Sequence, residues 1–229
     1  MNVLVLTRPN DGTAGRVVAE LERREVPVVR ADVGDFPLEM TVTASLAGTS
    51  AGWLGSMKRG GRCLPLDEVQ AIYYRRPTAF RFPDDLSPEQ QRFARAEARR
   101  GMAGLLLSLP VRWLSHPSRV ADAELKPLQL NLAAACGLTV PRTLLTNDAE
   151  AAGELVAQLA GPMIYKPLSA PSVHVGGELR LIYATEVDGA TLDADDTRLT
   201  AHLFQEWVPK QYDVRLKTRK VASDAALVA

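Results

Sequence analysis

Two lysines in the second half of the chain occupy positions at which a charged side chain is unexpected. Lys166 lies inside the apolar run MIYKPL, and Lys126 directly precedes a proline at a predicted helix start. Burying an ammonium group without an anion is costly, so a lysine in a strand interior is expected to turn its charge toward a polar cleft. The alternative is a surface lysine whose stem covers apolar area. The residues alone leave both interpretations of Lys166 open.

A glycine pair follows the second lysine. Gly176 and Gly177 stand between two predicted strands, at the tip of a loop. Such a pair usually forms a hairpin turn. It also suits a mobile flap whose backbone N–H groups contact a phosphate. The dipeptide does not decide between them.

The segment LFQEWVPKQYDVR, residues 203–215, combines an apolar strand, a proline break and an acid–base pair, Asp213 and Arg215. The strand edge, flanked by Trp207 and Val208, is suited to hold a flat heteroaromatic base between apolar walls. Asp213 would then fall where a ribose hydroxyl is held. The alternative is a plain C-terminal hairpin.

Composition narrows the class of protein. The 229 residues are 46% hydrophobic, with 27 basic and 27 acidic side chains, which is ordinary for a globular protein of one large or two small domains. The net charge of zero gives no reason to expect nucleic acid or an acidic membrane as partner. Cys63 and Cys136 lack metal-site spacing and fit a reducing compartment, and no signal peptide or membrane span is present. We therefore expect a cytoplasmic protein.

Residues 1–117 predict one open α/β domain. NVLVL is a strand, NDGTAG a loop, RVVAELERREV a helix and VPVVRAD a second strand. The loop matches neither GxGxxG nor the P-loop pattern, which favours a plain turn. LEMTVTASL and GWLGSM alternate like hairpin strands, and AIYYRRP is a strand that ends in an arginine pair. A long helix then begins with Ser87 as N-cap and Pro88 at its first position, and VRWLSHP is a strand.

A second α+β unit is predicted from residue 118. A short helix ends near Lys126, and a second helix starts with Pro127 and closes at Gly137. PRTLLT is a strand, and NDAEAAGELVAQLAG is a helix with Asn147 as N-cap and Glu150 at N3. PMIYKPL, LRLIYATEV and LFQEWV are strands, and SAPSVHVGG is a loop.

The order of these features resembles the ATP-grasp ligases. ADAELKPLQLNLAAACGLTVPRTLLTND, MIYKPL and FQEWVPKQYDVR carry the resemblance. More closely, with YYRRP and RWLSHP also matching, the chain resembles the ATP-grasp ribosomal peptide maturases, or graspetide macrocyclases. The resemblance runs from Met1 to about Leu216. It implies a pre-ATP-grasp α/β domain at 1–117 and an incomplete α+β ATP-grasp lobe at 118–216, made of a helical linker region 118–161 and a nucleotide-binding lobe 162–216.

The resemblance also assigns roles. The two lysines match the family's ATP-phosphate contacts, the glycines match its flap, and residues 205–208 match the hinge that reads adenine through backbone groups. Asp213 matches the ribose-side residue, and Asp213 with Arg215 matches the DxR motif that approaches the acidic peptide. The nucleotide-binding set is thus Lys126, Lys166, Gly176, Gly177, Gln205, Glu206, Trp207, Val208 and Asp213, with Arg215 toward the peptide.

The implied reaction is ATP-dependent activation of a side-chain carboxylate in a precursor peptide, followed by attack of a hydroxyl or amine of that peptide. The product is an ω-ester or ω-amide cross-link, and phosphoryl transfer of this kind uses Mg²⁺. In the family the metal is held by an acidic strand and a later Glu-x-Asn pair. Here residues 217–229 form an aberrant tail in which Asp224 is the only carboxylate side chain, so the chain is expected to be C-terminally truncated without metal ligands.

Two alternatives stay open. The chain could be a catalytically inactive module that binds the leader of a precursor peptide, or a glutathione synthetase-like or RimK-like amino-acid ligase. The expected partner in the leading hypothesis is an acidic precursor peptide with its leader, and a homodimer is compatible with the family.

Overall fold

The structure is a computed structural model that describes residues 2–48, 52–169, 172–176, 178–189 and 192–212. The chain divides into two compact units, Met1–Glu124 and Leu125–Ala229. Both combine helices and sheets, and the α/β class predicted from the sequence is confirmed. The first unit extends seven residues past the boundary predicted at residue 117, because helix α3 (Pro117–Ala123) belongs to it.

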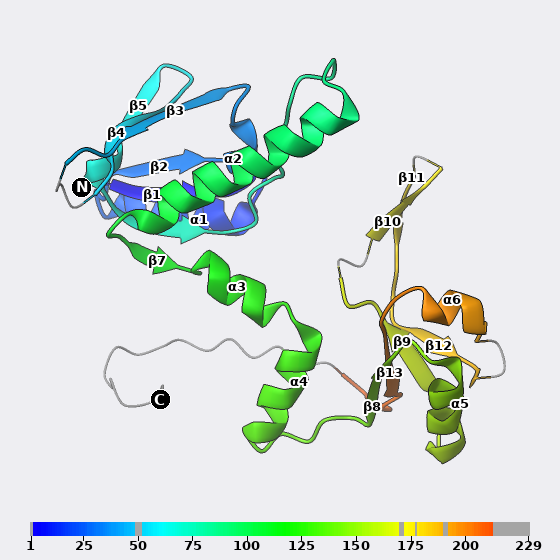
Figure 1. Cartoon of the computed structure of the whole chain (residues 1–229). Coiled ribbons are helices and arrows are strands. Elements are labelled where there is room, and N and C mark those ends of the chain that lie inside the picture. Colours follow the sequence, from blue (N-terminus) through cyan, green and yellow to red (C-terminus); the bar gives the residue numbers. More distant parts are fainter. Residues whose placement is uncertain (1, 49–51, 170–171, 177, 190–191, 213–229) are drawn as a thin grey trace. The chain divides into compact units, whose positions relative to one another are not determined.

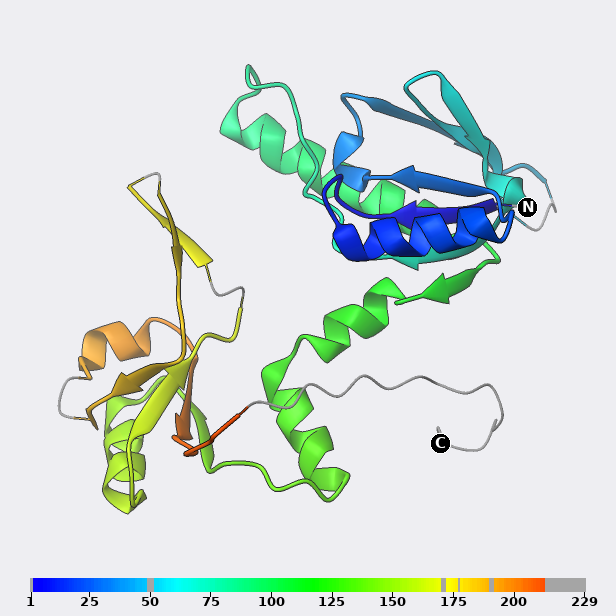
Figure 2. The same ribbon diagram turned by 180° about the vertical axis from the view of Figure 1, so that it is seen from behind.

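A four-stranded parallel sheet forms the centre of the first unit. Its strands are in the order β2-β1-β6-β7, and every neighbouring pair is parallel. Helices α1 and α2 lie on opposite faces of this sheet, as the two views show (Figures 1 and 2). The elements are β1 (Asn2–Leu6), α1 (Gly12–Arg23), β2 (Val28–Ala31), β6 (Val69–Tyr74), α2 (Pro88–Ser108) and β7 (Arg112–Leu114).

The core of the first unit explains why NVLVL reads as an unbroken apolar run. Strands with helices on both faces have no solvent side, so alternation is lost. Leu4, Leu6 and Ile72 are 0% exposed and cluster with Met102 and Leu106 of α2. The centre of the sheet is therefore fixed by side chains far apart in the sequence.

A second, antiparallel sheet of three strands adds to this unit. It consists of β3 (Met40–Ser45), β4 (Leu54–Arg59) and β5 (Arg62–Pro65), in that order. The sequence predicted the first two strands but not β5. The glycines between β4 and β5, Gly60 and Gly61, have φ of 54° and 76°, which is the left-handed geometry of a tight hairpin turn. That glycine pair was the available signal for the hairpin.

Helix α1 corrects one sequence prediction. The stretch NDGTAG was expected to be a loop, but the helix already begins at Gly12. Asp11 is the N-cap, and its Oδ1 accepts a hydrogen bond from the Ala14 N–H at 2.9 Å. A short polar side chain at the cap satisfies an otherwise unpaired N–H group. This cap outweighs the helix-breaking tendency of the glycines.

The second unit is built on a four-stranded antiparallel sheet. Its order is β12-β9-β13-β8, so the last strand among the described residues is an inner one. A separate two-stranded hairpin is formed by β10 and β11. The elements are α4 (Lys126–Ala135), β8 (Thr143–Thr146), α5 (Ala149–Gln158), β9 (Met163–Lys166), β10 (Ser172–Val175), β11 (Glu178–Leu181), β12 (Thr185–Val187), α6 (Ala194–Arg198) and β13 (His202–Glu206).

Several local predictions for this unit need correction. SAPSVHVGG contains strand β10 rather than only loop, and LRLIYATEV divides into β11 and β12. The N-cap of α5 is Asp148, one residue beyond the predicted Asn147. Leu125 caps α4, so Lys126 takes its first position and Pro127 its second. Helix α6, with Asp193 as N-cap, was not predicted.

Within the described residues the helices are too short or too polar to span a bilayer.

The N-terminus of α2 gives a test of local stability. The Ser87 hydroxyl accepts from the Gln90 N–H at 3.2 Å, and the Gln90 side chain accepts from the Ser87 N–H at 2.9 Å. Replacing Ser87 by Ala should lower the free energy of unfolding by about 1 kcal/mol, because one N–H group loses its acceptor. Ser87→Asp retains an acceptor and should stay close to wild type in urea unfolding. Equal stability of the alanine variant and wild type would contradict the role of the cap.

Candidate functional site

Strand β13 divides the second unit into two chemically different faces. Side chains of a strand alternate, so Phe204 points to one face while Leu203 and Gln205 point to the other. Phe204 is 2% exposed and packs with Met163 and Ala152 in the core beneath helix α5. His202, on the same face, stacks its ring on Phe204 with centroids 5.9 Å apart. The ring of this histidine thus packs against the apolar core of the unit.

A row of polar groups crosses three strands on the opposite face. The Lys166 Nζ donates to Gln205 Oε1 at 2.5 Å, and Gln205 Nε2 donates to Thr143 Oγ1 at 2.8 Å. Thr143 in turn donates to the Pro141 carbonyl oxygen at 2.8 Å. Gln205 stands opposite Thr143 in the β13–β8 register and diagonally from Lys166 in the β13–β9 register. The row is therefore a direct product of the strand pairing.

The direction of this hydrogen-bond row is fixed. A protonated lysine has no acceptor, so the oxygen of the Gln205 amide must face it. The amide nitrogen then points to Thr143. Gln205 is only 3% exposed, and a buried amide with both ends bonded is held in one orientation. Lys166 is thereby held in place by a neutral partner rather than by a carboxylate.

Three lysines gather at the end of strand β9. The Lys126 Nζ donates to the Leu168 carbonyl oxygen at 3.3 Å, just beyond Lys166. Burial lowers the pKa of Lys166, and the nearby charges of Lys210 and Lys126 lower it further. In the described part of the chain no carboxylate lies within ion-pair distance of Lys166. Lys126 and Lys166 are half-buried and Lys210 is exposed, and this group of positive charge is suited to receive an anion.

The predicted hinge residues follow directly from β13. The N–H groups of Glu206 and Trp207 donate to the carbonyl oxygens of Arg142 and Pro162, both at 2.9 Å. The Val208 N–H has no acceptor within the described residues. Trp207 and Val208 are 49% and 46% exposed. Of the hinge N–H groups, that of Val208 is thus the one open to a ligand.

The structure brings part of the predicted set together. Lys126, Lys166 and Gln205 converge, and residues 206–208 continue from the same strand. Gly176 lies at the turn between β10 and β11, with φ of 61°. Gly177, Asp213 and Arg215 lie outside the described residues, as does the stretch 217–229.

Thr143 and Lys210 belong to this site and were not identified from the sequence. Lys210 stands in VPKQYD, between the hinge and the DxR motif, so its position was a usable signal. Thr143 gave none, because its role depends on which strand pairs with β13.

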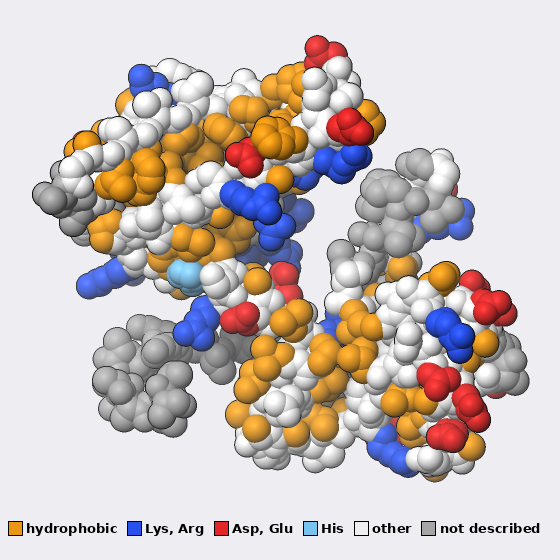
Figure 3. Space-filling view, in the orientation of Figure 1, with side chains coloured by type: hydrophobic (Ala, Val, Ile, Leu, Met, Phe, Trp, Pro, Cys, Tyr) orange, Lys and Arg blue, Asp and Glu red, His pale blue; other side chains and the backbone are white. Residues whose placement is uncertain are grey.

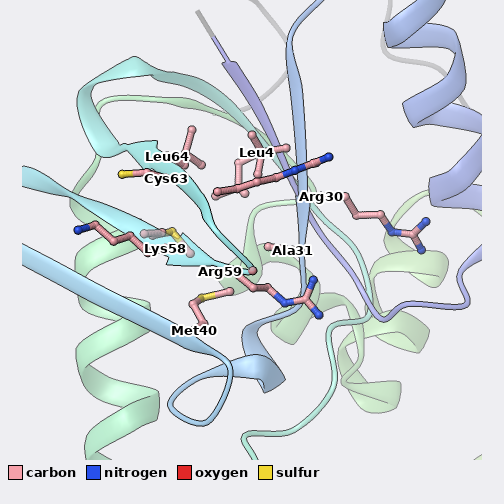
Figure 4. A pocket seen from close by; sticks show the side chains of 12 residues that line it. Leu4, Arg30, Ala31, Met40, Lys58, Arg59, Cys63 and Leu64 are labelled. Carbon is pink, nitrogen blue, oxygen red and sulfur yellow. The ribbon is translucent and has the colours of Figure 1, made fainter.

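The first unit holds two other cavities of interest. One of about 200 Å³ lies between the parallel sheet and the β3–β5 sheet, with Leu4, Met40 and Leu64 among its lining residues (Figure 4). Two of its basic residues are engaged elsewhere, since Arg59 pairs with Asp35 at 2.6 Å and Arg30 donates to the Arg8 carbonyl. A mainly apolar groove of about 910 Å³ lies beside α2 (Figure 3). Neither offers a set of groups for phosphoryl or acid–base chemistry.

Comparison with known proteins decides the family. Residues 2–121 match the family model described as the MvdD pre-ATP grasp domain. Solved structures with the same fold include macrocyclase MdnB from Microcystis aeruginosa MRC, 32% identical with a TM-score of 0.78. This chain belongs to the ATP-grasp peptide maturases. It is homologous to peptide ligases and macrocyclases of ribosomally made peptides.

Two further structures extend the comparison. Macrocyclase MdnC of the same organism, bound with precursor peptide MdnA, is 28% identical with a TM-score of 0.82. A Chryseobacterium gregarium ATP-grasp ligase in complex with ADP and a leader and core peptide is 20% identical with a TM-score of 0.79, which shows a shared fold. These alignments cover 92% of this maturase-family chain for MdnB and MdnC and 89% for the third. The chain spans 69%, 69% and 62% of those proteins, respectively. No curated protein sequence matches it.

The lowered pKa of Lys166 predicts a reactivity difference. Below the ordinary lysine pKa of 10.5, a larger fraction of Lys166 is neutral than of a lysine in a short unfolded peptide, because the pKa of Lys166 is lowered. Acetylation of Lys166 should therefore reach half its maximal rate at lower pH than acetylation of the lysine in a synthetic peptide of sequence MIYKPL. Competitive labelling with acetic anhydride across a pH series, read by peptide mass spectrometry, measures both midpoints. Identical midpoints would show that burial and the neighbouring lysines do not perturb Lys166.

Proposed function

We propose that this chain is the nucleotide-binding part of an ATP-dependent ligase that activates a side-chain carboxylate of a ribosomally made precursor peptide. The observation that carries the proposal is the polar row on β13 and its neighbours, which fixes Lys166 with two further lysines nearby. A ligand with several phosphate charges matches this group in sign. Membership in the maturase family supports the same assignment.

Each described residue takes a defined part in this proposal. Lys166 and Lys126 bind the phosphate groups of ATP through charge-assisted hydrogen bonds. The Val208 N–H donates to the edge of the adenine, whose faces lie against apolar groups of the hinge. Gln205 positions Lys166, and Gly176 in its hairpin approaches the phosphates as a flap. Asp213 and Arg215 are proposed to serve the ribose and the peptide carboxylate.

ATP supplies the phosphoryl group that converts the peptide carboxylate into an acyl phosphate. A hydroxyl or amine of the same peptide then attacks the acyl carbon and releases inorganic phosphate. The peptide forms one ester or amide bond and loses one water overall. The bound peptides named for the MdnC and C. gregarium structures support a precursor peptide with a leader as the partner.

Magnesium is part of phosphoryl transfer in such enzymes. Among the described residues there is no group of three or more His, Cys, Asp or Glu side chains able to hold a metal ion. The described part of the site therefore does not fit a metal centre, and no step is assigned to one. The phosphate contacts proposed above use lysines and backbone groups only.

Product formation tests the proposed reaction. Incubation of the chain with ATP, MgCl₂ and a leader-bearing peptide rich in Asp, Glu, Ser and Thr should yield a peptide lighter by one water per cross-link. Mass spectrometry with and without ATP measures this. Unchanged peptide that still binds would instead support the leader-binding module. Modification of a different carboxylate acceptor with a free amino acid would support the amino-acid ligase.

Nucleotide affinity tests the placement of the site. Lys166→Ala should weaken binding of a fluorescent ATP analogue by roughly 10- to 100-fold, because it removes a charge-assisted bond to phosphate worth roughly 1.5–3 kcal/mol. Lys58→Ala removes an equal charge from the exposed strand β4 and should leave the affinity at wild-type level. Equal affinities of the two variants would refute the assignment of Lys166.

A further inference from the structure

The arginine pair at the end of strand β6 takes no part in the site described above. Arg75 and Arg76 follow Tyr74, the last residue of β6, and they meet the loop that follows β1. Together with Arg8 and Arg16 they line a cavity of about 380 Å³. Four arginines thus line one small space, all within the first unit.

The topology of the sheet explains this position. From β1 the chain continues to β2 on one side, while β6 lies on the other side. In open parallel sheets the crevice at the carboxyl ends of two such strands is the usual ligand position. The arginines stand at those ends, because Arg8 follows β1 and Arg75 follows β6.

One carboxylate lies within the cavity lining, and it is already in use. Both oxygens of Asp11 accept from the Arg75 Nε, at 3.2 and 3.0 Å, and Oδ1 also caps helix α1. These bonds lower the pKa of Asp11, and the pairing raises the pKa of Arg75. In the described part of the chain, no carboxylate lies within ion-pair distance of Arg8, Arg16 or Arg76.

The backbone around the cavity is held in a fixed and partly strained form. Arg76 has φ of 45°, a left-handed conformation that costs energy for a residue with a side chain. Its carbonyl oxygen accepts from the Arg8 N–H at 3.3 Å. Arg30 donates to the carbonyl oxygens of Arg8 and Pro9, at 2.9 and 2.5 Å. The two loops that carry Arg8 and the Arg75–Arg76 pair are therefore tied to each other and to strand β2, whereas Arg16 lies on helix α1.

We propose that this arginine cavity, lined by Arg8, Arg16, Arg75 and Arg76, binds side-chain carboxylates of the acidic peptide on which the protein acts. Guanidinium groups bind carboxylates in a bidentate manner, and several in one rigid place favour a segment with more than one acidic residue. The rest of the lining is Asn10, Thr13, Asp11 and one glycine, so no aromatic or aliphatic wall is present to hold a nucleotide base. The choice of the peptide rests on the proposed function.

Peptide affinity of the full chain is the test. The probe is a fluorescein-labelled synthetic peptide of Asp and Glu among Ser and Thr, compared with the same peptide carrying Asn and Gln. Arg16→Gln and Arg76→Gln should each weaken binding of the acidic peptide by about tenfold in fluorescence anisotropy, the loss of one charge-assisted contact. Neither should change the affinity for the amide peptide. Both side chains are exposed and form no ion pair with any residue that the structure describes, so folding should be retained.

Two controls keep the outcomes separate. Arg62→Gln removes the same charge from the exposed strand β5 and should leave peptide affinity unchanged. Affinity for the ATP analogue should be at wild-type level in all three variants. If the wild type itself does not bind nucleotide, the proposed function is refuted, and the peptide measurements still test the arginine cavity separately. Unchanged affinity for the acidic peptide in Arg16→Gln and Arg76→Gln would overturn the inference. Arginine-dependent binding of inorganic phosphate without any effect on the peptide would overturn it in favour of a free-anion site.

Discussion

The structure of the second unit depends on strand β13, which pairs on both of its edges and has a different environment on each of its faces. As an inner strand it must pair with β9 on one side and β8 on the other, and its side chains must satisfy two different environments. Phe204 completes an apolar core beneath a helix, while its neighbour Gln205 is buried among polar groups. A buried amide is tolerated only when both of its ends are bonded. Lys166 and Thr143 meet that condition, and the same two bonds order the lysine.

The sequence predicted the strands that build this arrangement, and Lys126, Lys166 and Gln205, which it singled out, lie together in the structure. Lys166 stands out because a charge inside an apolar strand needs a reason, and the hinge follows from the apolar run that ends at Val208. Strand pairing was not predictable, because register depends on contacts between segments about 40 and 60 residues apart in the sequence. The part that Thr143 takes in the site was therefore not predicted, and neither was the reason for the burial of Gln205. The division of LRLIYATEV into two strands has the same origin.

In the first unit the long elements were predicted well and the short ones poorly. Ser87 and Pro88 gave a strong start signal for α2, and the capping box confirms it. The start of α1 was misplaced because glycines weigh against helix, whereas the Asp11 cap decides the outcome in the folded chain. Strand β5 was not predicted because its four residues are too few to show the alternation of a strand. The arginine pair was recognised in the sequence, but its neighbours in space were not. Only the parallel pairing of β1 and β6 brings Arg8 beside Arg76.

The one-way order of the bonds from Lys166 through Gln205 to Thr143 makes the Gln205 amide a built-in spectroscopic reporter. Its oxygen faces the ammonium group, and its nitrogen faces a hydroxyl on another strand. The two amide protons are therefore inequivalent, since the nitrogen that carries them donates to Thr143. Any event that moves the charge of Lys166 changes the polarisation of the whole amide. A single pair of side-chain resonances would thus register events on three strands at once.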